Sequence, residues 1–449
     1  MNPQNNVEEW IMGFFQEVKS HQKKKVIRSV LPQCGRCGRT MAVEKTRTGK
    51  VRRVCQNPKI PVSGEGRQEI LIVREQPTQI NDASADWLTS VGGHSFLAAA
   101  FQKAGLDIQK DCWTTGAALC YGKGHAALAV ECCRANLLGT IKELKPKVIV
   151  PVGIGATQAV LSHLWREGSG EMLRFCGYQI PAKKWNAWVC PVFDSAYILS
   201  LGHRHADKDE HADKNDQNPV TLRGLSGVAF LWLERHIAAI WDKLPNRPFD
   251  GNTKDRITLL YNTDEIADAL ESIGNSDKGW AAFDYETNCL KPEVTGAKVL
   301  CVSVCLGGWN KDICTIAFPM SKEVRQAWIR FLQSPVPKIA HNLKMEDRWS
   351  RVHFGTEVNN WAVDTMLNAH ILDCSKGVTG LKFQAFAHFG ESGYDDVAEP
   401  YIKSGNGKLN RLHTLPIEKL LVYCATDSLM TWRLAITQMR ELGQEKYWQ

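Results

Sequence analysis

Acidic residues recur in the C-terminal half of the chain at spacings that place them on one side of a backbone. Asp284 and Glu286 are two residues apart, so in an extended strand both carboxylates point to the same face. Tyr423 and Asp427 are four residues apart in a helix-compatible run, and a helix puts residues at that separation on one face. The sequence therefore predicts a phenol and at least three carboxylates that converge.

A further acid, Glu346, follows Asn342 by four residues in a second helix-compatible run. Magnesium and manganese prefer oxygen ligands, and a pair of such ions can hold both the attacking and the leaving oxygen of a phosphodiester. The sequence thus predicts a site for two divalent cations, Mg²⁺ or Mn²⁺, with Tyr423 orienting the attacking water. The candidate ligands are Asp284, Glu286, Glu346 and Asp427.

The elements around these residues suit a mixed α/β sheet. Residues 280–283 form an apolar run that leads into the first two acids, and residues 299–304 and 313–318 are two further strand-like runs. Another acid, Asp364, lies where a helix is expected to begin. The order strand, strand, strand, helix, strand, helix predicts a ribonuclease H type of sheet with its acids at the sheet's end.

With these motifs in order, residues 256–449 resemble the proofreading 3'-5' exonuclease domain of family A DNA polymerases, in the subclass whose last motif is Tyr-x-x-x-Asp. The resemblance implies that Asp284, Glu286 and Asp427 are metal ligands and that Tyr423 orients the water. The second motif departs, because Glu346 stands where the family usually has Asp, and Asp347 follows it. Glu346 keeps the spacing from Asn342, which favours it over Asp347.

The N-terminal half carries a second chemical signature in its cysteines. Cys34 and Cys37 form a C-x-x-C pair, and Cys120 and Cys133 lie far downstream. Four thiolates from two places in the chain can hold an iron-sulfur cluster or a zinc ion. An alternative zinc site would use Cys34, Cys37 and Cys55 with a fourth ligand.

Strands are predicted at residues 69–73, 113–120 and 144–153, with helices at 96–105 and from Ala156 onward, which indicates a central parallel sheet with active loops at strand ends. With its cysteines, this segment resembles the iron-sulfur uracil-DNA glycosylases of family 4 over roughly residues 30–245. The resemblance implies a 4Fe-4S cluster on four cysteines, the last of them at the start of a helix, with zinc as the alternative and Cys132 as a substitute for this last ligand. The implied ligands are Cys34, Cys37, Cys120 and Cys133.

The catalytic residues of that family are matched less well. Glu75 and Pro77 are kept in the first loop, whereas Gly116 stands at the position of the uracil-reading Asn and Asp194 at that of the His that supports the leaving base. A missing base contact removes about 1 to 3 kcal/mol of discrimination, and a negative Asp194 would oppose a developing uracil anion. The sequence predicts a degenerate glycosylase pocket in a DNA-binding domain.

Length and charge agree with an intracellular, cytoplasmic nucleic-acid enzyme. A chain of 449 residues exceeds what one core usually supports, and the net charge of +7 is concentrated in the basic residues between Lys19 and Arg53. No secretory or membrane-spanning segment is expected, and 15 cysteines without an export signal indicate reduced thiols. The predicted parts are an arm at 1–29, a glycosylase-like domain at 30–245 with a charged loop at 203–218, and the exonuclease domain at 256–449.

The first hypothesis for function is a metal-dependent 3'-5' exonuclease that acts on DNA, either single strands or primer 3' ends. Since only 22 residues follow Asp427, a DNA polymerase would be a separate chain, an arrangement expected of a bacteriophage replication module. A second hypothesis is a replisome scaffold in which both halves are inactive. A third is an active uracil or modified-base glycosylase with an accessory exonuclease.

Overall fold

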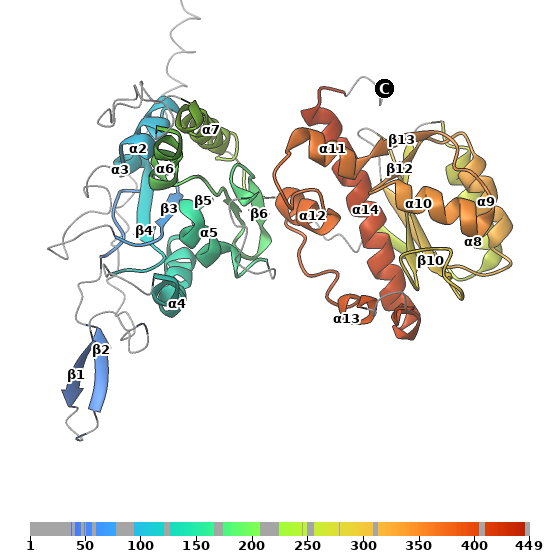
Figure 1. Ribbon diagram of the computed structural model, residues 1–449, viewed down its shortest axis with the longest axis horizontal. Helices are drawn as coiled ribbons and strands as arrows, with labels where there is room; N and C mark the ends of the chain where they lie inside the picture. Colours follow the sequence, from blue (N-terminus) through green and yellow to red (C-terminus); the bar gives the residue numbers. More distant parts are fainter. Residues whose placement is uncertain are drawn as a thin grey trace, which may run out of the picture.

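A computed structural model gives the arrangement of the chain in two lobes (Figure 1). The structure describes residues 37, 41–45, 49, 51–55, 60–77, 94–120, 126–165, 174–206, 224–244, 246–248, 256–277, 279–308, 313–403 and 409–444. Cys34 and most of the basic residues between Lys19 and Arg53 lie outside the described residues. A two-stranded ribbon, β1 (Met41–Lys45) with β2 (Val51–Cys55), precedes the first lobe.

The C-terminal lobe is built on a mixed six-stranded sheet in the order β13-β12-β9-β10-β11-β8. Its strands are β8 (Ile257–Leu259), β9 (Trp280–Thr287), β10 (Val299–Gly307), β11 (Cys314–Pro319), β12 (Lys338–Ala340) and β13 (Trp361–Asp364). The strands β9, β10 and β11 are antiparallel neighbours, whereas β12 pairs parallel with both β9 and β13. The predicted mixed sheet of the ribonuclease H type is therefore confirmed, with β8 added at one edge.

Helices cover both faces of this sheet. On one face α8 (Thr263–Gly274) and α9 (Arg325–Gln333) bury Ile266, Leu270 and Trp328 against Phe283. On the other face the long helix α14 (Ile417–Glu441) packs along the sheet, with α11 (Thr365–Leu372) and α12 (Leu381–Phe389) beside it (Figure 1). Side chains alternate along β9, so Asp284 and Glu286 are directed to one face and Phe283 and Tyr285 to the other.

The N-terminal lobe contains a five-stranded sheet in the order β4-β3-β5-β7-β6. Its strands are β3 (Ile70–Arg74), β4 (Cys112–Gly116), β5 (Val148–Pro151), β6 (Ile180–Ala182) and β7 (Ala187–Val189), all parallel except β6. Its helices are α2 (His94–Lys103), α3 (Ile108–Asp111), α4 (Ala126–Leu144), α5 (Gly153–Leu161), α6 (Ser195–Ala206) and α7 (Gly224–Trp241). The first strand, β3, lies inside the sheet, so the strand order reverses between β3 and β5, which is where such sheets usually bind ligands.

Three sequence predictions are corrected by the local structure. The strand expected at 113–120 ends at Gly116, because the chain leaves the sheet there. The amides of Ala117 and Ala118 donate to the carbonyls of Arg74, at the end of β3, and of Glu75. Cys133 lies in the middle of α4 and not at a helix start. Residues 203–206, assigned to the charged loop, complete α6, and residues 207–218 lie outside the described residues.

A fourth correction concerns the second acidic motif. Asn342 has a positive φ of 66° and lies ahead of α10 (Lys344–Trp349), so it does not share a helix with Glu346. The two residues are four positions apart in the sequence, but this separation does not place them on one face of a helix.

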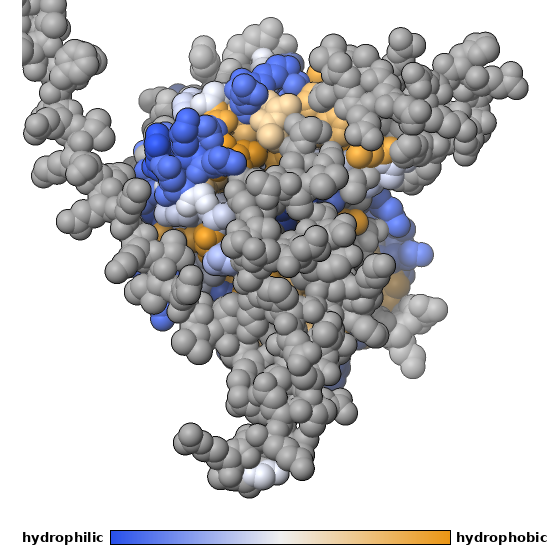
Figure 2. All heavy atoms as spheres, turned by 90° about the vertical axis from the view of Figure 1, so that its left-hand side faces the viewer, coloured by the Kyte–Doolittle hydropathy of each residue, from blue (hydrophilic) through white to orange (hydrophobic). Residues whose placement is uncertain are grey.

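The surface of the N-terminal lobe that faces away from the C-terminal lobe is mixed. Hydrophobic residues lie beside strongly hydrophilic ones on this side (Figure 2). Among the described residues, no helix is both long and apolar enough to cross a lipid bilayer.

Candidate active site

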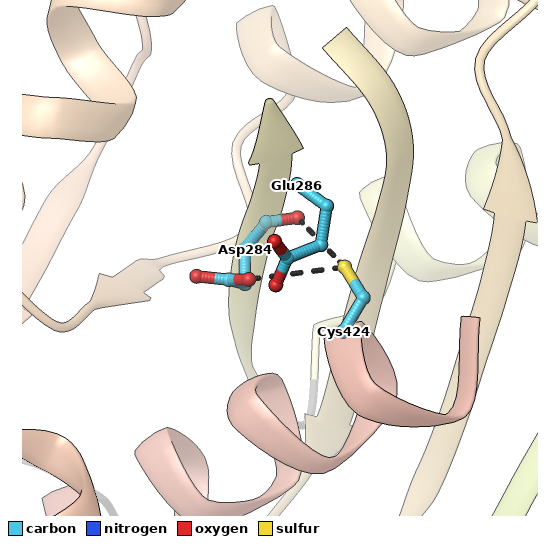
Figure 3. Close-up of side chains that lie close together, drawn as sticks. All are labelled: Asp284, Glu286 and Cys424. Carbon is cyan, nitrogen blue, oxygen red and sulfur yellow. Dashed lines mark hydrogen bonds between the residues drawn. The ribbon is translucent and has the colours of Figure 1, made fainter. Parts of the chain in front are cut away.

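Strand β9 directs two acids toward α14. Asp284 and Glu286 project from the same face of the strand, and both point toward Cys424 of α14 (Figure 3). Tyr285 between them turns to the opposite face, where its hydroxyl lies 2.8 Å from Ser350 Oγ and accepts from Trp328 Nε1 at 3.0 Å. This alternation, anchored by a buried aromatic side chain, confirms the expectation that the two carboxylates share one face.

Helix α14 carries the rest of the last motif. Tyr423, Cys424 and Asp427 are all buried on the side of the helix that faces the sheet. Cys424 Sγ lies 3.6 Å from the carbonyl oxygen of Asp284 and 3.8 Å from its Oδ2. The backbone at this point is fixed by Ser303 of β10, whose hydroxyl donates to the Cys424 carbonyl at 2.8 Å. The ligand atoms of Asp284, Glu286 and Cys424 lie within 4.8 Å of one another.

The two candidates of the second motif have different surroundings. Glu346 is 3 % exposed, interacts electrostatically with Asp284, and its Oε2 is a buried atom with no partner among the described residues. Asp347 instead lies toward the surface, where its Oδ2 pairs with Arg351 at 2.8 Å. The geometry therefore brings Glu346, and not Asp347, to the acids of β9.

Asp364, the additional acidic residue noted in the sequence, stabilises the start of a helix. It is the N-cap of α11, and its carboxylate accepts from the amide of Met366 at 2.9 Å. The same carboxylate accepts from the amides of Asn342 at 3.1 Å and Leu343 at 3.0 Å. Asp364 thus links the left-handed turn before α10 to the start of α11. Because α10 begins directly after this turn, the turn fixes the position of Glu346 in the first turn of α10.

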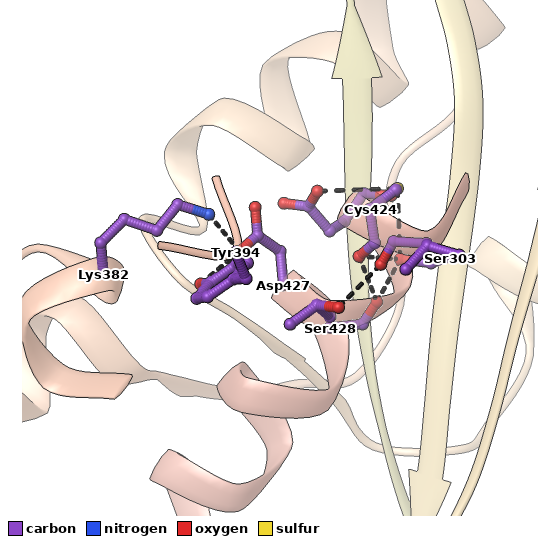
Figure 4. Close-up of polar contacts among 9 residues, drawn as sticks. Ser303, Lys382, Tyr394, Cys424, Asp427 and Ser428 are labelled. Carbon is purple, nitrogen blue, oxygen red and sulfur yellow. Dashed lines mark hydrogen bonds and ion pairs between the residues drawn. The ribbon is translucent and has the colours of Figure 1, made fainter. Parts of the chain in front are cut away.

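Two residues that the sequence did not single out contact Asp427. Lys382 of α12 forms an ion pair with Asp427 Oδ1, and the hydroxyl of Tyr394 donates to the same oxygen at 2.7 Å (Figure 4). The Lys382 ammonium also lies over two rings, 4.2 Å from the centre of Tyr394 and 4.4 Å from that of Tyr423. Nothing in the local spacing of Lys382 or Tyr394 could have predicted these contacts, because both residues lie more than thirty positions from Asp427.

Burial and mutual repulsion perturb the acids of this cluster. The pKa of Asp284 is raised well above its usual range by burial and then by the charge of Asp427, although Lys382 opposes the shift. The pKa values of Glu286 and Glu346 are also raised, first by burial and then by the charge of Asp284. Carboxylates gathered in this way are costly to ionise without compensating positive charge.

The phenol of Tyr423 is held neutral. Its pKa is raised well above its usual range by burial and by the nearby charges of Asp427, Glu286 and Asp284. A neutral phenol can donate and accept hydrogen bonds but does not act as a base at ordinary pH. Tyr423 is therefore suited to orienting a polar group and not to removing a proton from it.

A divalent cation fits this cluster. The donors are carboxylate oxygens, which hard cations prefer, and one of them, Glu346 Oε2, is buried without a partner. Bound cations would offset the repulsion that raises the pKa values of the acids. Cys424 adds a sulfur donor at the edge of the group, which softer metals such as zinc accept more readily than magnesium does.

Two of the predicted pocket residues, Glu75 and Asp194, lie beside the first turn of α5, at the end of the sheet of the N-terminal lobe. Glu75 follows β3, and a Cβ on Gly155 of α5 would overlap its carboxylate, while Asp194 lies against Gly153. Asp194 interacts electrostatically with the buried Arg74. Pro77 and Gly116 are buried at the ends of β3 and β4. These positions surround the point where the strand order reverses.

The three described cysteines of the predicted cluster, Cys37, Cys120 and Cys133, are buried. Cys37 and Cys133 belong to one apolar cluster, and Cys120 is 3 % exposed. The sulfur atoms of these three described cysteines do not all lie within 4.8 Å of one another, whereas the ligand atoms of Asp284, Glu286 and Cys424 do. Cys34 lies outside the described residues, so the predicted set of four is not complete in the structure.

The sheet order of the C-terminal lobe places its fold in the ribonuclease H-like class. Residues 257–442 match the model of a protein family described as 3'-5' exonuclease. The C-terminal lobe therefore contains the sequence features of a 3'-5' exonuclease domain.

Several solved structures align with part of this chain at low sequence identity. The catalytic core of RRP6 from Trypanosoma brucei aligns at 13 % identity over 45 % of this chain and 52 % of that one, with a TM-score of 0.31. RNase D of Trypanosoma brucei, in complex with RNA, aligns at 13 % identity over 40 % of this chain and 61 % of that one, with a TM-score of 0.32. NrnC of Brucella melitensis aligns at 16 % identity over 43 % of this chain and 86 % of that one, with a TM-score of 0.27.

The chain thus spans about half of the length of the RRP6 core that it matches. No curated protein matches the sequence.

Proposed function

We propose that the protein removes nucleotides from the 3' end of DNA, with single strands and primer ends as substrates. The observation that carries the proposal is the convergence of Asp284, Glu286, Glu346 and Asp427, three of them with pKa values raised by burial and repulsion. Such a cluster is unfavourable unless cations bind it. A scaffold without catalysis would have no reason to keep these acids together.

The proposed ligands of two divalent cations, Mg²⁺ or Mn²⁺, are Asp284, Glu286, Glu346 and Asp427. When bound, such ions polarise the phosphodiester and stabilise charge on the attacking and leaving oxygens. The remaining work falls to the side chains around them. Tyr423, a neutral phenol, positions the attacking water by hydrogen bonding, and Lys382 and Tyr394 hold Asp427 Oδ1, so that its other oxygen is not committed to them.

The test is incubation of the whole protein with 5'-labelled substrates, namely a DNA single strand, a primed DNA duplex and an RNA strand of equal length. Each is incubated with Mg²⁺, Mn²⁺ or EDTA. We expect stepwise shortening of the DNA from the 3' end that requires a divalent metal. Products of a single internal cut, or undiminished activity in EDTA, would contradict the proposal. Faster loss of RNA than of DNA would contradict its substrate.

For the N-terminal lobe we propose a glycosylase-like DNA-binding domain with a 4Fe-4S cluster on Cys34, Cys37, Cys120 and Cys133. Thiolates around a single zinc ion stand less than about 4 Å apart. An iron-sulfur cluster places its own iron and sulfide atoms between the thiolates, so it suits cysteines that are more widely spaced. The burial of all three described thiols, with Cys37 and Cys133 in one apolar cluster, supports a metal cluster shielded from water.

The colour of the protein tests the cluster. We expect purified protein to be brown, with iron and sulfide in near-equal amounts, and we expect replacement of Cys34, Cys37, Cys120 or Cys133 to bleach it. Replacement of Cys289, Cys301 or Cys314, which lie in or beside strands of the exonuclease sheet, should leave the colour unchanged. A colourless protein with stoichiometric zinc would favour the alternative site that includes Cys55.

The proposed biological setting is proofreading or repair with a DNA polymerase supplied by another chain, as in a bacteriophage replication module inside a bacterial cytoplasm. It depends on the resemblance of the exonuclease motifs to those of family A polymerases. A pull-down of the full-length protein with a polymerase from the same source, followed by exonuclease assays on mismatched and matched primers, tests it. Equal rates on both primers, with no retained polymerase, would contradict it.

A further inference from the structure

Helix α12 belongs to the cores of both lobes. On one side Phe383 and Phe386 are buried in the apolar cluster of the N-terminal lobe, where Phe386 stacks on Trp165 with ring centres 4.7 Å apart and Phe383 lies 5.0 Å from Phe175. On the other side Ala385 is buried with Leu429 and other residues of α14. Figure 1 shows the helix between β6 and α14.

The chain on either side of α12 is also tied to the N-terminal lobe. Before the helix, Tyr178 donates its hydroxyl proton to Asp373 Oδ2 at 3.3 Å and Arg174 donates to the Gly377 carbonyl at 3.2 Å. After the helix, Glu391 forms an ion pair with Lys183. The lobes are therefore joined by a continuous set of contacts along residues 373–391.

Gly390, which caps α12, lies close against β6 of the N-terminal lobe. Its φ is +67°, and a Cβ at this position would overlap the carbonyl oxygen of Pro181 in β6. Any side chain at 390 would therefore push the two lobes apart. Gly355 provides a matched control, because its φ is +70° and a Cβ there would meet no atom within 4 Å.

The same helix delivers Lys382 to the exonuclease site. Lys382 precedes Phe383, so its ion pair with Asp427 Oδ1 depends on where the packing of Phe383 and Phe386 places the first turn of α12. Lys382 also covers the rings of Tyr394 and Tyr423. Helix α12 thus connects the core of the N-terminal lobe to Asp427, a predicted metal ligand whose carboxylate is oriented by Lys382.

We propose that the N-terminal lobe is a positioning part of the exonuclease site, and that it acts through α12 and Lys382. Docking of the lobe fixes α12, α12 fixes Lys382, and Lys382 with Tyr394 holds Asp427 in the orientation that leaves Oδ2 for a cation. Lys382 is a positioning residue in this scheme. Partners that orient a metal ligand typically contribute about 10-fold to 100-fold in activity or metal affinity.

The experiment measures kcat and KM on a 5'-labelled single strand with the full-length protein. Gly390→Ala is compared with Gly355→Ala, which has the same backbone strain without the clash. Trp165→Leu, on the N-terminal side of the interface, is compared with Trp113→Leu, a tryptophan of similar burial on β4, at the far edge of the same sheet. Melting curves establish that each variant is folded at the assay temperature.

We expect Gly390→Ala and Trp165→Leu to lower kcat about 10-fold or more, with KM changed less than about 2-fold, while both controls stay near the unmodified protein. Lys382→Met should give a similar loss, and Lys382→Arg should retain more activity because it keeps the charge. In the Lys382→Met background, Gly390→Ala should add little, since both changes act through one contact.

Three results would overturn the proposal. The first is an equal loss in the control variants, which would make the effect one of general stability. The second is full activity of both Gly390→Ala and Trp165→Leu when limited proteolysis shows the lobes to be separated. The third is a multiplicative loss in the double variant, which would mean that the interface and Lys382 act independently. Should Gly390→Ala fail to fold, the two tryptophan variants decide the question alone.

Discussion

The two lobes place acids at comparable positions and arrange them differently. In the N-terminal lobe Glu75 and Asp194 lie half-buried at strand ends, each against a glycine of the α5 turn, with the Arg74 charge near Asp194. In the C-terminal lobe several carboxylates converge, and their pKa values rise through burial and repulsion. An acidic residue at the end of a strand is therefore not enough to indicate a catalytic site. Several carboxylates close together do indicate a cation site, because a bound cation offsets their repulsion.

The largest expected effect comes from removing a central acid of the candidate exonuclease site. Asp284→Ala and Asp427→Ala should each lower the rate of 3' shortening by on the order of 1000-fold or more, because each removes a charged ligand from a site of paired ions. The measurement is single-turnover degradation of a 5'-labelled strand in Mg²⁺. Glu75→Ala in the N-terminal lobe serves as the contrast and should leave this rate unchanged. A loss of less than about 10-fold in either aspartate variant would place the cation elsewhere.

A smaller effect separates the two neighbours of the second motif. Glu346→Gln should lower the rate by about 100-fold, since it leaves a buried amide where a cation needs a charge. Asp347→Asn should change the rate less than about 2-fold, because that carboxylate pairs with Arg351 near the surface. Titration of both variants with Mn²⁺ provides the measurement. The reverse order of the two effects would show that α10 turns when a metal binds.

Tyr423→Phe should reduce the rate by roughly 10-fold, which is less than the loss of either aspartate, because the phenol orients a group without supplying charge to it. Its raised pKa predicts that activity shows no step attributable to Tyr423 up to pH 9. The check is a rate profile between pH 6 and pH 9 for the unmodified protein and the variant. A step present in the first and absent from the second would mean that the phenol ionises.

The N-terminal pocket should not excise uracil, and two substitutions in it should increase uracil excision, so that both lobes would be catalytic. Uracil-containing DNA treated with the protein and then with alkali should stay intact, because Gly116 has no side chain to read the base and Asp194 opposes a leaving anion. Gly116→Asn with Asp194→His should increase alkali-labile cleavage if the remaining pocket is preserved. Efficient cleavage by the unmodified protein would establish Glu75 as part of an active glycosylase. An exonuclease-dead background such as Asp284→Ala keeps the substrate intact during the assay.

The smallest effect concerns acid stability. Burial lowers the pKa of His236 to about 4 in the folded N-terminal lobe, against an unfolded value of about 6.5. The unfolded chain therefore binds a proton first, so the His236 contribution to stability is lost as the pH falls from about 6.5 to 4, by at most about 1.4 kcal/mol per unit. Urea unfolding at pH 7.5 and pH 5 should show a smaller difference for His236→Leu than for the unmodified protein. An equal difference would mean that His236 is already exposed to solvent.

The strands and helices could be read from the sequence where a periodic pattern was long. The alternation along β9 and the four-residue separation on α14 both survive in the structure, because each depends on one element only. Errors arose where a turn intervened, as at Asn342, whose left-handed backbone breaks the presumed helix, and at Gly116, where β4 ends early.

The sequence by itself thus determined the residue types of the exonuclease site, the order of its motifs and the face on which Asp284 and Glu286 lie. The sequence also favoured Glu346 over Asp347, although by a helical relation to Asn342 that the structure does not contain. Tertiary structure alone decided that Asp364 caps a helix and that Lys382 and Tyr394 hold Asp427. It also decided that α12 is buried in both lobes. Local spacing fixes the direction of a side chain within one element, but contacts between distant segments depend on how those elements pack, and packing is a property of the whole fold.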